Sequence, residues 1–242
     1  MRALIITLME HGKPTPVRAA KICMNSIADT GTDLTPEIFK ATTPKTNTED
    51  MIATFGKKVK WDWPMDESKN CWDFSSGLFK KNYPARDQSR VIACAVSHAR
   101  AWKECVDSQE EMVILEQDAK FTRKFEPSIF EGWKWGAIGL NDPRGATRKA
   151  GSYYKLMMED GRHIQPVPNV DKELTDHLPL GLAGNSAYII RPELAKQLLE
   201  RIEEKGMWPN DALMCKQLFP SIRVCYPFYT TVQQLGSTTT RL

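Results

Sequence analysis

Short apolar runs alternate with helical apolar stripes along most of the chain. Residues 2–8 form a run rich in β-branched side chains, bounded by polar positions, which predicts a buried first strand. A helix is expected from about Val17, with Gly31 just past its end. Its apolar positions recur at spacings of three and four: Val17, Ala20, Met24 and Ile27. Strand, loop and helix in this order are typical of the start of an α/β fold.

The same alternation continues to the carboxyl end. Further strands are expected at 38–41, 112–115, 133–140, 187–190 and 222–226. Helices are expected from Ser89, from Pro192 to Gly206, and from Asn210. Residues 153–158 and 162–167 flank an Asp-Gly pair, which predicts a hairpin because Asp-Gly tolerates the positive φ angles of a tight turn.

Residues 56–88 lack the regular hydrophobic pattern of the rest of the chain. They mix lysines, tryptophans and turn residues without a sustained period of two or 3.6. So much aromatic surface is not normally left in water, so we expect an ordered but irregular insertion in one domain of residues 1–242.

Composition and charge fit a globular protein. Hydrophobic residues make up 41% and charged residues 26%, and the net charge is +3, values that exclude a disordered, collagenous or membrane-embedded chain. The first apolar run is far shorter than the roughly 20 residues that span a bilayer, and it lacks a cleavage site. The six cysteines contain no C-x-x-C pair and sit mostly in apolar stretches, as reduced core thiols do in the cytoplasm.

The strongest chemical signal is an acidic pair, Glu116 and Asp118, at the end of the apolar run 112–115. Two carboxylates separated by one residue can point the same way and share a hard divalent cation. In open α/β sheets, ligands bind at the carboxyl ends of the strands. An acidic turn after a strand is also common without any metal.

Two other sites have an ordinary structural explanation beside a functional one. Ser97 and His98 lie in the preceding helix, where a histidine facing the sheet is more often a satisfied core residue. Asp211 lies in the first turn of a predicted helix, where the helix dipole alone favours an acid.

A basic and aromatic stretch follows residue 143. Positions 144–155 contain no acid, and the 56–88 segment adds further lysines. The basic and aromatic residues of the two stretches are Arg144, Arg148, Lys149, Tyr153, Tyr154 and Lys155, with Lys57, Lys58, Lys60, Lys80 and Lys81. Such surfaces bind phosphates and stack bases. The small net charge favours a solvated surface instead.

Several phrases, in this order, resemble glycosyltransferase family 25, the lipooligosaccharide and collagen-sugar transferase family. IACAVSHARAWKECV at 92–106 is similar to the family's cysteine, serine-histidine and tryptophan helix, and ILEQDAKF at 114–121 to its acidic strand end. AGNSAYIIRPELAKQLL at 183–199, WPNDALM at 208–214 and VCYPFYTTVQQLGST at 224–238 resemble later segments. Gln117 departs from the family, which usually has aspartate there, and Asn185 or Ser186 holds the family's threonine position.

The resemblance implies a GT-A-like α/β fold with a Rossmann-type, mainly parallel central sheet and helices on both faces. It implies a transferase that moves a sugar from a nucleotide-sugar, by family preference a UDP-sugar, to an acceptor hydroxyl with inversion. Mn²⁺ or Mg²⁺ held by Glu116 and Asp118 would stabilise the leaving phosphate. By position in the family-like phrases, Asp211 is the expected catalytic base, and Arg18, Ser97 and His98 are expected to bind the donor.

The acceptor is left open by the sequence. A sugar of a bacterial surface oligosaccharide is the family's commonest use. A hydroxymethylated base in viral DNA is the alternative, motivated by the basic and aromatic stretch. A non-catalytic protein that binds a nucleotide-sugar or nucleic acid is a third possibility, for which Gln117 is the only hint. With no export signal visible, we expect a cytoplasmic protein, in the host cytoplasm if the chain is viral.

Overall fold

A computed structural model describes residues 1–9, 14–83, 85, 87–145, 150–170 and 177–233. The helices are α1 (Pro14–Asp29), α2 (Asn47–Phe55), α3 (Gln88–Ser108), α4 (Ala150–Asp160), α5 (Pro192–Lys205) and α6 (Asn210–Leu213). The strands are β1 (Arg2–Thr7), β2 (Thr35–Lys40), β3 (Cys71–Asp73), β4 (Leu78–Lys80), β5 (Met112–Glu116), β6 (Ala119–Phe121), β7 (Ala137–Gly139), β8 (Ile164–Pro166), β9 (Ala187–Ile190), β10 (Ile222–Cys225) and β11 (Thr230–Val232). Short 3₁₀ segments cover Glu67–Lys69, Pro127–Phe130 and Pro143–Gly145.

The main sheet has seven strands in the order β2-β1-β5-β9-β7-β10-β8. β1 pairs in parallel with β2 and β5, and β7 pairs in parallel with β10. β9 runs antiparallel to both β5 and β7, and β8 runs antiparallel to β10. Five of the seven strands therefore share one direction, as a mainly parallel sheet requires, and their carboxyl ends lie at one edge.

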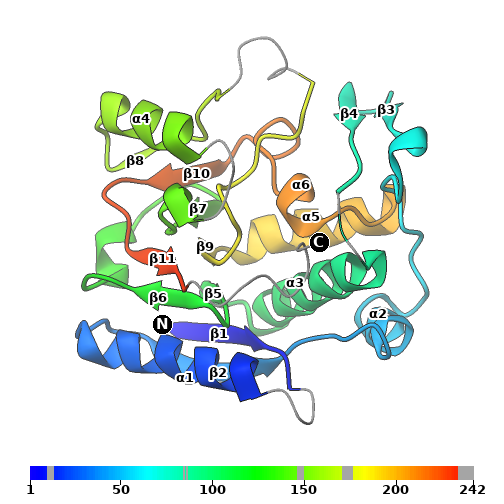
Figure 1. Ribbon diagram of the computed structural model, residues 1–242. Coiled ribbons are helices and arrows are strands. Elements are labelled where there is room, and N and C mark those ends of the chain that lie inside the picture. The colour runs from blue at the N-terminus through cyan, green and yellow to red at the C-terminus, as the bar shows by residue number, and fades with distance from the viewer. Residues whose placement is uncertain (10–13, 84, 86, 146–149, 171–176, 234–242) are drawn as a thin grey trace.

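Alternating side chains of the strands divide the core between the two faces of the sheet. Leu4 and Ile6 of β1 belong to a cluster with residues of α3 and α5, whereas Ala3 and Ile5 pack with residues of α1. Helices accordingly cover both faces, α1 on one and α3 with α5 on the other (Figure 1). The expected α/β architecture is confirmed.

The irregular segment 56–88 is ordered by its aromatic side chains. Trp63 is 7% exposed, and its ring lies 5.2 Å from that of Trp208 and 6.1 Å from that of Tyr83. Lys80 is also buried, and its ammonium pairs with Asp62 at 2.8 Å. Among the described residues of this segment, the helices and strands are one 3₁₀ turn, the β3–β4 hairpin and the first residue of α3, Gln88. These contacts bring the segment against the chain just before α6.

Two predictions of secondary structure are wrong. Residues 153–158 belong to α4 rather than to a hairpin strand. Gly161 has a φ of +68°, and its N–H bonds the carbonyl of Met157, so the Asp-Gly pair ends a helix. The strand expected at 133–140 is shorter in the structure, where it is β7. Trp133 precedes it, with its N–H bonded to the carbonyl of Phe130 and its indole donating to Glu111. Among the described residues, no helix is long and apolar enough to cross a membrane.

Candidate functional site

The acidic turn after β5 lies at the carboxyl-end edge of the sheet. Glu116 N–H donates to the carbonyl of Ser186 at 2.8 Å, and Gln117 N–H donates to that of Ile6 at 3.0 Å. The side chain of Gln117 accepts from Leu8 N–H at 2.9 Å. Gln117 thus fastens the end of β1 to this turn, a role that leaves the carboxylates of Glu116 and Asp118 available for chemistry.

Gln233 fixes the same turn from the other end of the chain. Its N–H donates to the carbonyl of Asp118 at 2.7 Å. Its side-chain amide donates to the carbonyls of Ala19 at 3.1 Å and Ala119 at 3.2 Å. Gln233 therefore ties α1, the acidic turn and β6 together. No local pattern indicates this role, because the partners Ala119 and Ala19 lie 114 and 214 residues away along the chain.

Electrostatics distinguish Asp118 from an ordinary turn acid. Burial, followed by the charge of Glu116, raises the pKa of Asp118 to about 7. Its Oδ1 is buried without a hydrogen-bond partner. Two neighbouring carboxylates, one of them with an unsatisfied oxygen, match the hard oxygen donors that Mn²⁺ and Mg²⁺ prefer. The residues present therefore fit a divalent cation.

His98 orients Glu116 through a buried hydrogen-bond chain. The indole of Trp102 can only donate, and it lies 2.8 Å from the hydroxyl of Tyr188. That hydroxyl lies 2.8 Å from Nδ1 of His98, and Nε2 lies 3.2 Å from Glu116. With Glu116 ionised, the network assigns the imidazole proton to Nε2, which donates to the carboxylate. His98 is fully buried, so it touches Glu116 rather than solvent.

Cys94 completes the surroundings of Glu116. Its sulfur lies 4.0 Å from Oε1 of Glu116, and one ligand atom each of Cys94, His98 and Glu116 lies within 4.8 Å of the others. Burial raises the pKa of the Cys94 thiol well above its usual value. The protonated thiol and the imidazole therefore both face Glu116 as donors.

Asp211 lies in the short helix α6. Burial raises the pKa of its carboxyl group, whereas a hydrogen bond from the hydroxyl of Tyr83 acts in the opposite direction. The charge of Glu116 also raises the pKa of Asp211, so the two acids share one site. The 56–88 segment thus places the hydroxyl of Tyr83 against the carboxyl group of Asp211.

Ser97 and Arg18, which were also expected to bind the donor, lie in different surroundings from the acids. Ser97 is 1% exposed; its hydroxyl donates to the carbonyl of Ala93 and accepts from Thr42 N–H, both at 2.8 Å. It therefore holds the loop after β2 in place. Arg18 is exposed near the start of α1, which follows the carboxyl end of β1. The structure brings Glu116, Asp118, His98 and Asp211 together and leaves Ser97 beneath the β2 loop.

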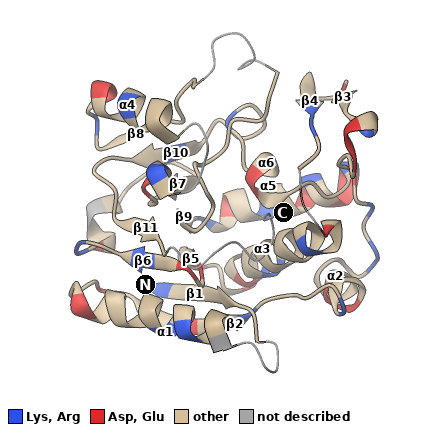
Figure 2. Cartoon of the chain, in the orientation of Figure 1, with Lys and Arg blue, Asp and Glu red and all other residues tan. Residues whose placement is uncertain are grey.

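The basic and aromatic stretch is partly neutralised. Arg144 pairs with Asp142 at 2.6 Å and stacks on the ring of Tyr154 at 4.2 Å. Tyr153 is buried, and Arg148 and Lys149 lie outside the described residues. Figure 2 shows Lys and Arg distributed over many elements rather than gathered in one place.

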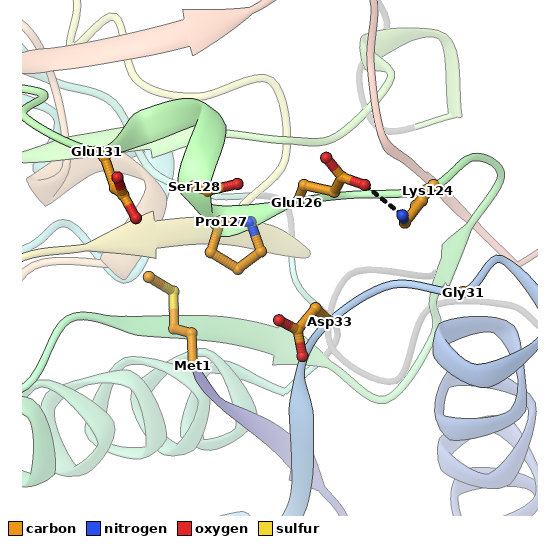
Figure 3. Close-up of a pocket in the computed structure, with 8 residues that line it drawn as sticks. All are labelled: Met1, Gly31, Asp33, Lys124, Glu126, Pro127, Ser128 and Glu131. Carbon is orange, nitrogen blue, oxygen red and sulfur yellow. Dashed lines mark ion pairs between the residues drawn. The ribbon is translucent and has the colours of Figure 1, made fainter.

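A shallow depression of about 350 Å³ lies away from these residues (Figure 3). It is lined by Met1 and Asp33, which precede β1 and β2, and by five residues after β6: Lys124, Glu126, Pro127, Ser128 and Glu131. Within it, Lys124 and Glu126 form an ion pair. The depression thus lies at the amino-end edge of the sheet, across from the acids.

Two solved structures resemble the chain distantly. Mouse xyloside xylosyltransferase 1 in its apo form is 11% identical with a TM-score of 0.41, covering 91% of this chain and 78% of that one. An active-site mutant of LgtC is 12% identical with a TM-score of 0.38, covering 93% and 72%. TM-scores below 0.5 add nothing to the identification. No curated protein matches the chain.

A family model covers most of the chain. Residues 24–214 match glycosyltransferase family 25, described as an LPS biosynthesis protein. The match includes segments that carry the resemblance: α3, the acidic turn after β5, β9 and the helix of Asp211. The chain therefore belongs to glycosyltransferase family 25, and it is a glycosyltransferase with the mainly parallel α/β sheet expected from its sequence.

Proposed function

We propose that this glycosyltransferase moves a sugar from a UDP-sugar to an acceptor hydroxyl in a metal-dependent, inverting reaction. The observation that carries the proposal is the meeting of Glu116 and Asp118 with Asp211, whose pKa responds to the charge of Glu116. Two acids can hold a cation against a diphosphate, and a third can take a proton. Metal binding by two acids and proton acceptance by the third together support a single sugar-transfer reaction.

Glu116 and Asp118 are the proposed metal-binding residues. When bound, Mn²⁺ or Mg²⁺ would supply charge that stabilises the diphosphate leaving group. The chain's own contribution is to hold the two carboxylates ready. His98 and Cys94 face Glu116, and Gln233 fixes the backbone of Asp118. Such support limits the movement of the acids during the reaction.

Asp211 is the proposed catalytic base. An alcohol attacks poorly until its proton has somewhere to go, and a carboxylate with a raised pKa is a better acceptor of that proton. Desolvation supplies the increase, while the hydrogen bond from Tyr83 keeps the ionised form accessible. Direct attack by the acceptor inverts the anomeric carbon.

Arg18 and Ser97 are proposed to act on the donor in different ways. The exposed guanidinium of Arg18, near the carboxyl end of β1, is available to a nucleotide phosphate. Ser97 acts through the backbone of Thr42, which follows β2. Substituting Arg18 should therefore weaken donor binding more than it affects folding.

The proposed acceptor is a sugar of a surface oligosaccharide. The description of the matching family as an LPS biosynthesis protein supports a saccharide. The ion pair between Arg144 and Asp142 weakens the case for a modified DNA base, because it removes charge that phosphates would need. Membership of an enzyme family also favours catalysis over a purely binding role.

Thermal-shift titration tests the proposal. UDP-sugars with Mn²⁺ should raise the melting temperature of the protein, because a ligand that binds only the folded state stabilises it. Asp118→Asn should lose the Mn²⁺-dependent part of the shift. A wild-type protein that responds to no UDP-sugar in Mn²⁺ would contradict the proposal. Retention on DNA at low salt, with steep loss as salt rises, would move the acceptor from saccharide to nucleic acid.

A further inference from the structure

Buried polar atoms without partners gather beside the acidic turn. Asn185 Oδ1, Ser186 Oγ and Asn141 Oδ1 have no hydrogen-bond partner. Asn185 and Ser186 are each 4% exposed, and Asn141 is 7% exposed. An unpaired polar atom in such a place destabilises the folded chain, so each requires a physical reason. The proposed metal and base leave these three side chains unexplained.

The segment that carries Asn185 and Ser186 connects the two halves of the site. The carbonyl of Ser186 accepts from Glu116 N–H at 2.8 Å, which places Ser186 beside the acidic turn. The amide of Asn185 reaches the sulfur of Met214 at 3.5 Å, directly after the helix that carries Asp211. These contacts set Asn185 and Ser186 between the proposed metal-binding acids and the proposed base.

Neighbouring backbone holds this segment tightly. A Cβ added at Gly181 would lie 2.4 Å from the carbonyl oxygen of Asp211, so the backbone at Gly181 packs directly against the backbone at Asp211. The amide nitrogen of Asn141 donates to the carbonyl of Ala183 at 3.3 Å. The unpaired atoms therefore sit on a supported backbone. The side chain of Asn185 leaves one polar atom unpaired in either orientation of its amide, because only one end faces Met214.

The chemistry of an inverting transfer requires a sugar in this position. The anomeric carbon must lie between the leaving phosphate and the attacking hydroxyl, so the transferred sugar lies between the metal-binding acids and the base. A sugar presents several hydroxyl groups, each of which can donate and accept. An amide oxygen and a serine hydroxyl are suitable partners for such groups, and burial makes these hydrogen bonds selective.

We propose that Asn185 and Ser186 bind hydroxyl groups of the transferred sugar, with Asn141 beside them, and so determine which sugar is accepted. This proposal rests on the function proposed above. It predicts that Asn185 and Ser186 bind the sugar of the donor, whereas other residues bind its nucleotide. Removing the polar atoms of Asn185 and Ser186 should therefore weaken the binding of UDP-sugar and leave the affinity for UDP unchanged.

Calorimetric titration in Mn²⁺ separates these contributions. UDP and the tightest-binding member of UDP-glucose, UDP-galactose and UDP-N-acetylglucosamine are titrated into wild type, Asn185→Ala and Ser186→Ala. We expect the Kd of the UDP-sugar to rise about 10-fold in Asn185→Ala, since one lost hydrogen bond of about 1.4 kcal/mol is a tenfold change. Ser186→Ala, a smaller change, should give a 3- to 10-fold increase, and the Kd of UDP should stay within about 2-fold.

Asn47→Ala is the matched control. Asn47 of α2 also has a buried, unpaired Oδ1, while its amide nitrogen donates to the carbonyl of Ser89 at 3.1 Å. Its replacement should change neither Kd. This control separates loss of a sugar contact from the general effect of removing a buried amide.

The possible failures are distinguishable. If wild type binds neither UDP nor any UDP-sugar, the proposed function fails and this proposal fails with it. If wild type binds them but both variants keep the UDP-sugar affinity, only the sugar contact is overturned. Equal weakening of UDP and UDP-sugar overturns it as well. A lower melting temperature with unchanged affinities would assign the unpaired atoms to a buried water.

Discussion

The two edges of the sheet handle charge in opposite ways. At the amino-end edge, Arg2 lies 2.8 Å from Glu37 and 3.0 Å from Glu104, and Arg191 lies 2.8 Å from Glu111. At the carboxyl-end edge, Glu116, Asp118 and Asp211 have no lysine or arginine partner in the part of the chain that is described. One edge is neutralised, and the other concentrates negative charge.

This difference separates stability from function. Paired charges at the amino-end edge add modestly to folding and need no ligand. Unpaired, partly buried acids destabilise the folded chain and are retained where a cation or a proton must bind. The location of unpaired charge is therefore a better guide to the site than the location of the depression near Met1.

The largest expected effect comes from removing a metal-binding acid. Asp118→Ala should lower Mn²⁺-dependent transfer by about 10³-fold, because a bound cation contributes several kcal/mol of transition-state stabilisation. Initial rates with UDP-sugar and acceptor measure this loss. Asp33→Ala, which removes an acid at the opposite edge, should keep the wild-type rate. Full activity of Asp118→Ala in EDTA would remove the metal from the mechanism.

The next effect concerns the proposed base. Asp211→Asn should lower the rate of transfer by about 10²-fold or more, the usual size of a general-base contribution, and leave the affinity for UDP intact. In wild type, transfer should fall as the pH decreases through the raised pKa of Asp211. Unchanged transfer in Asp211→Asn would move the base to another residue.

A smaller effect should be visible in the stability of the metal-free protein. The pKa of Asp118 is about 7 in the folded chain and near its ordinary 3.8 when unfolded. Folding is therefore favoured most below about pH 4, and this contribution is lost as the pH rises toward 7. Asp118→Asn should be more stable than wild type at pH 8 by on the order of 1–2 kcal/mol.

Urea denaturation in EDTA at pH 4.5 and pH 8 measures that difference. The gain from Asp118→Asn should shrink toward zero at the lower pH, where the wild-type carboxyl is protonated in the folded chain. Added Mn²⁺ should reverse the order of the two proteins at pH 8. If wild type and Asp118→Asn had equal free energies of unfolding at pH 8 as well as at pH 4.5, the pKa of Asp118 would not be raised by folding.

The smallest effect is expected at the paired edge. Arg2→Ala should reduce the free energy of unfolding by up to about 1 kcal/mol, since partly exposed ion pairs contribute little. The rate of transfer per folded molecule should not change. Arg2 holds the pKa of Glu37 below its usual value, so the effect of Arg2→Ala should diminish in acid. A large loss of transfer in Arg2→Ala would contradict the separation of the two edges, because it would show that the amino-end edge also contributes to activity.

Local patterns in the sequence predicted much of the fold and the acidic part of the site. The helical spacing of α1 and α5 and the apolar run of β5 depend on neighbours within a few turns, so they can be recognised from one segment. The end of β5 then located Glu116 and Asp118. The Asp-Gly pair that ends at Gly161 predicted a hairpin wrongly, because a positive φ occurs at the end of a helix as well as in a hairpin turn.

The support around the acids could not be recognised in this way. The hydroxyl of Tyr188 lies 90 residues from His98 along the chain, and Tyr83 reaches Asp211 from the irregular segment. Neither tyrosine follows a spacing rule, because each contact depends on how distant elements pack. The unpaired atoms of Asn185 and Ser186 likewise become visible only when burial is known.

Gln233 has a consequence for synthesis on the ribosome. The acid-bearing turn is made by residue 119, yet the side chain that fastens it to α1 is added more than a hundred residues later. A nascent chain that ends before Gln233 would carry Glu116 and Asp118 on a turn that lacks its link to α1. Metal-dependent turnover should therefore begin only after this glutamine has left the exit tunnel.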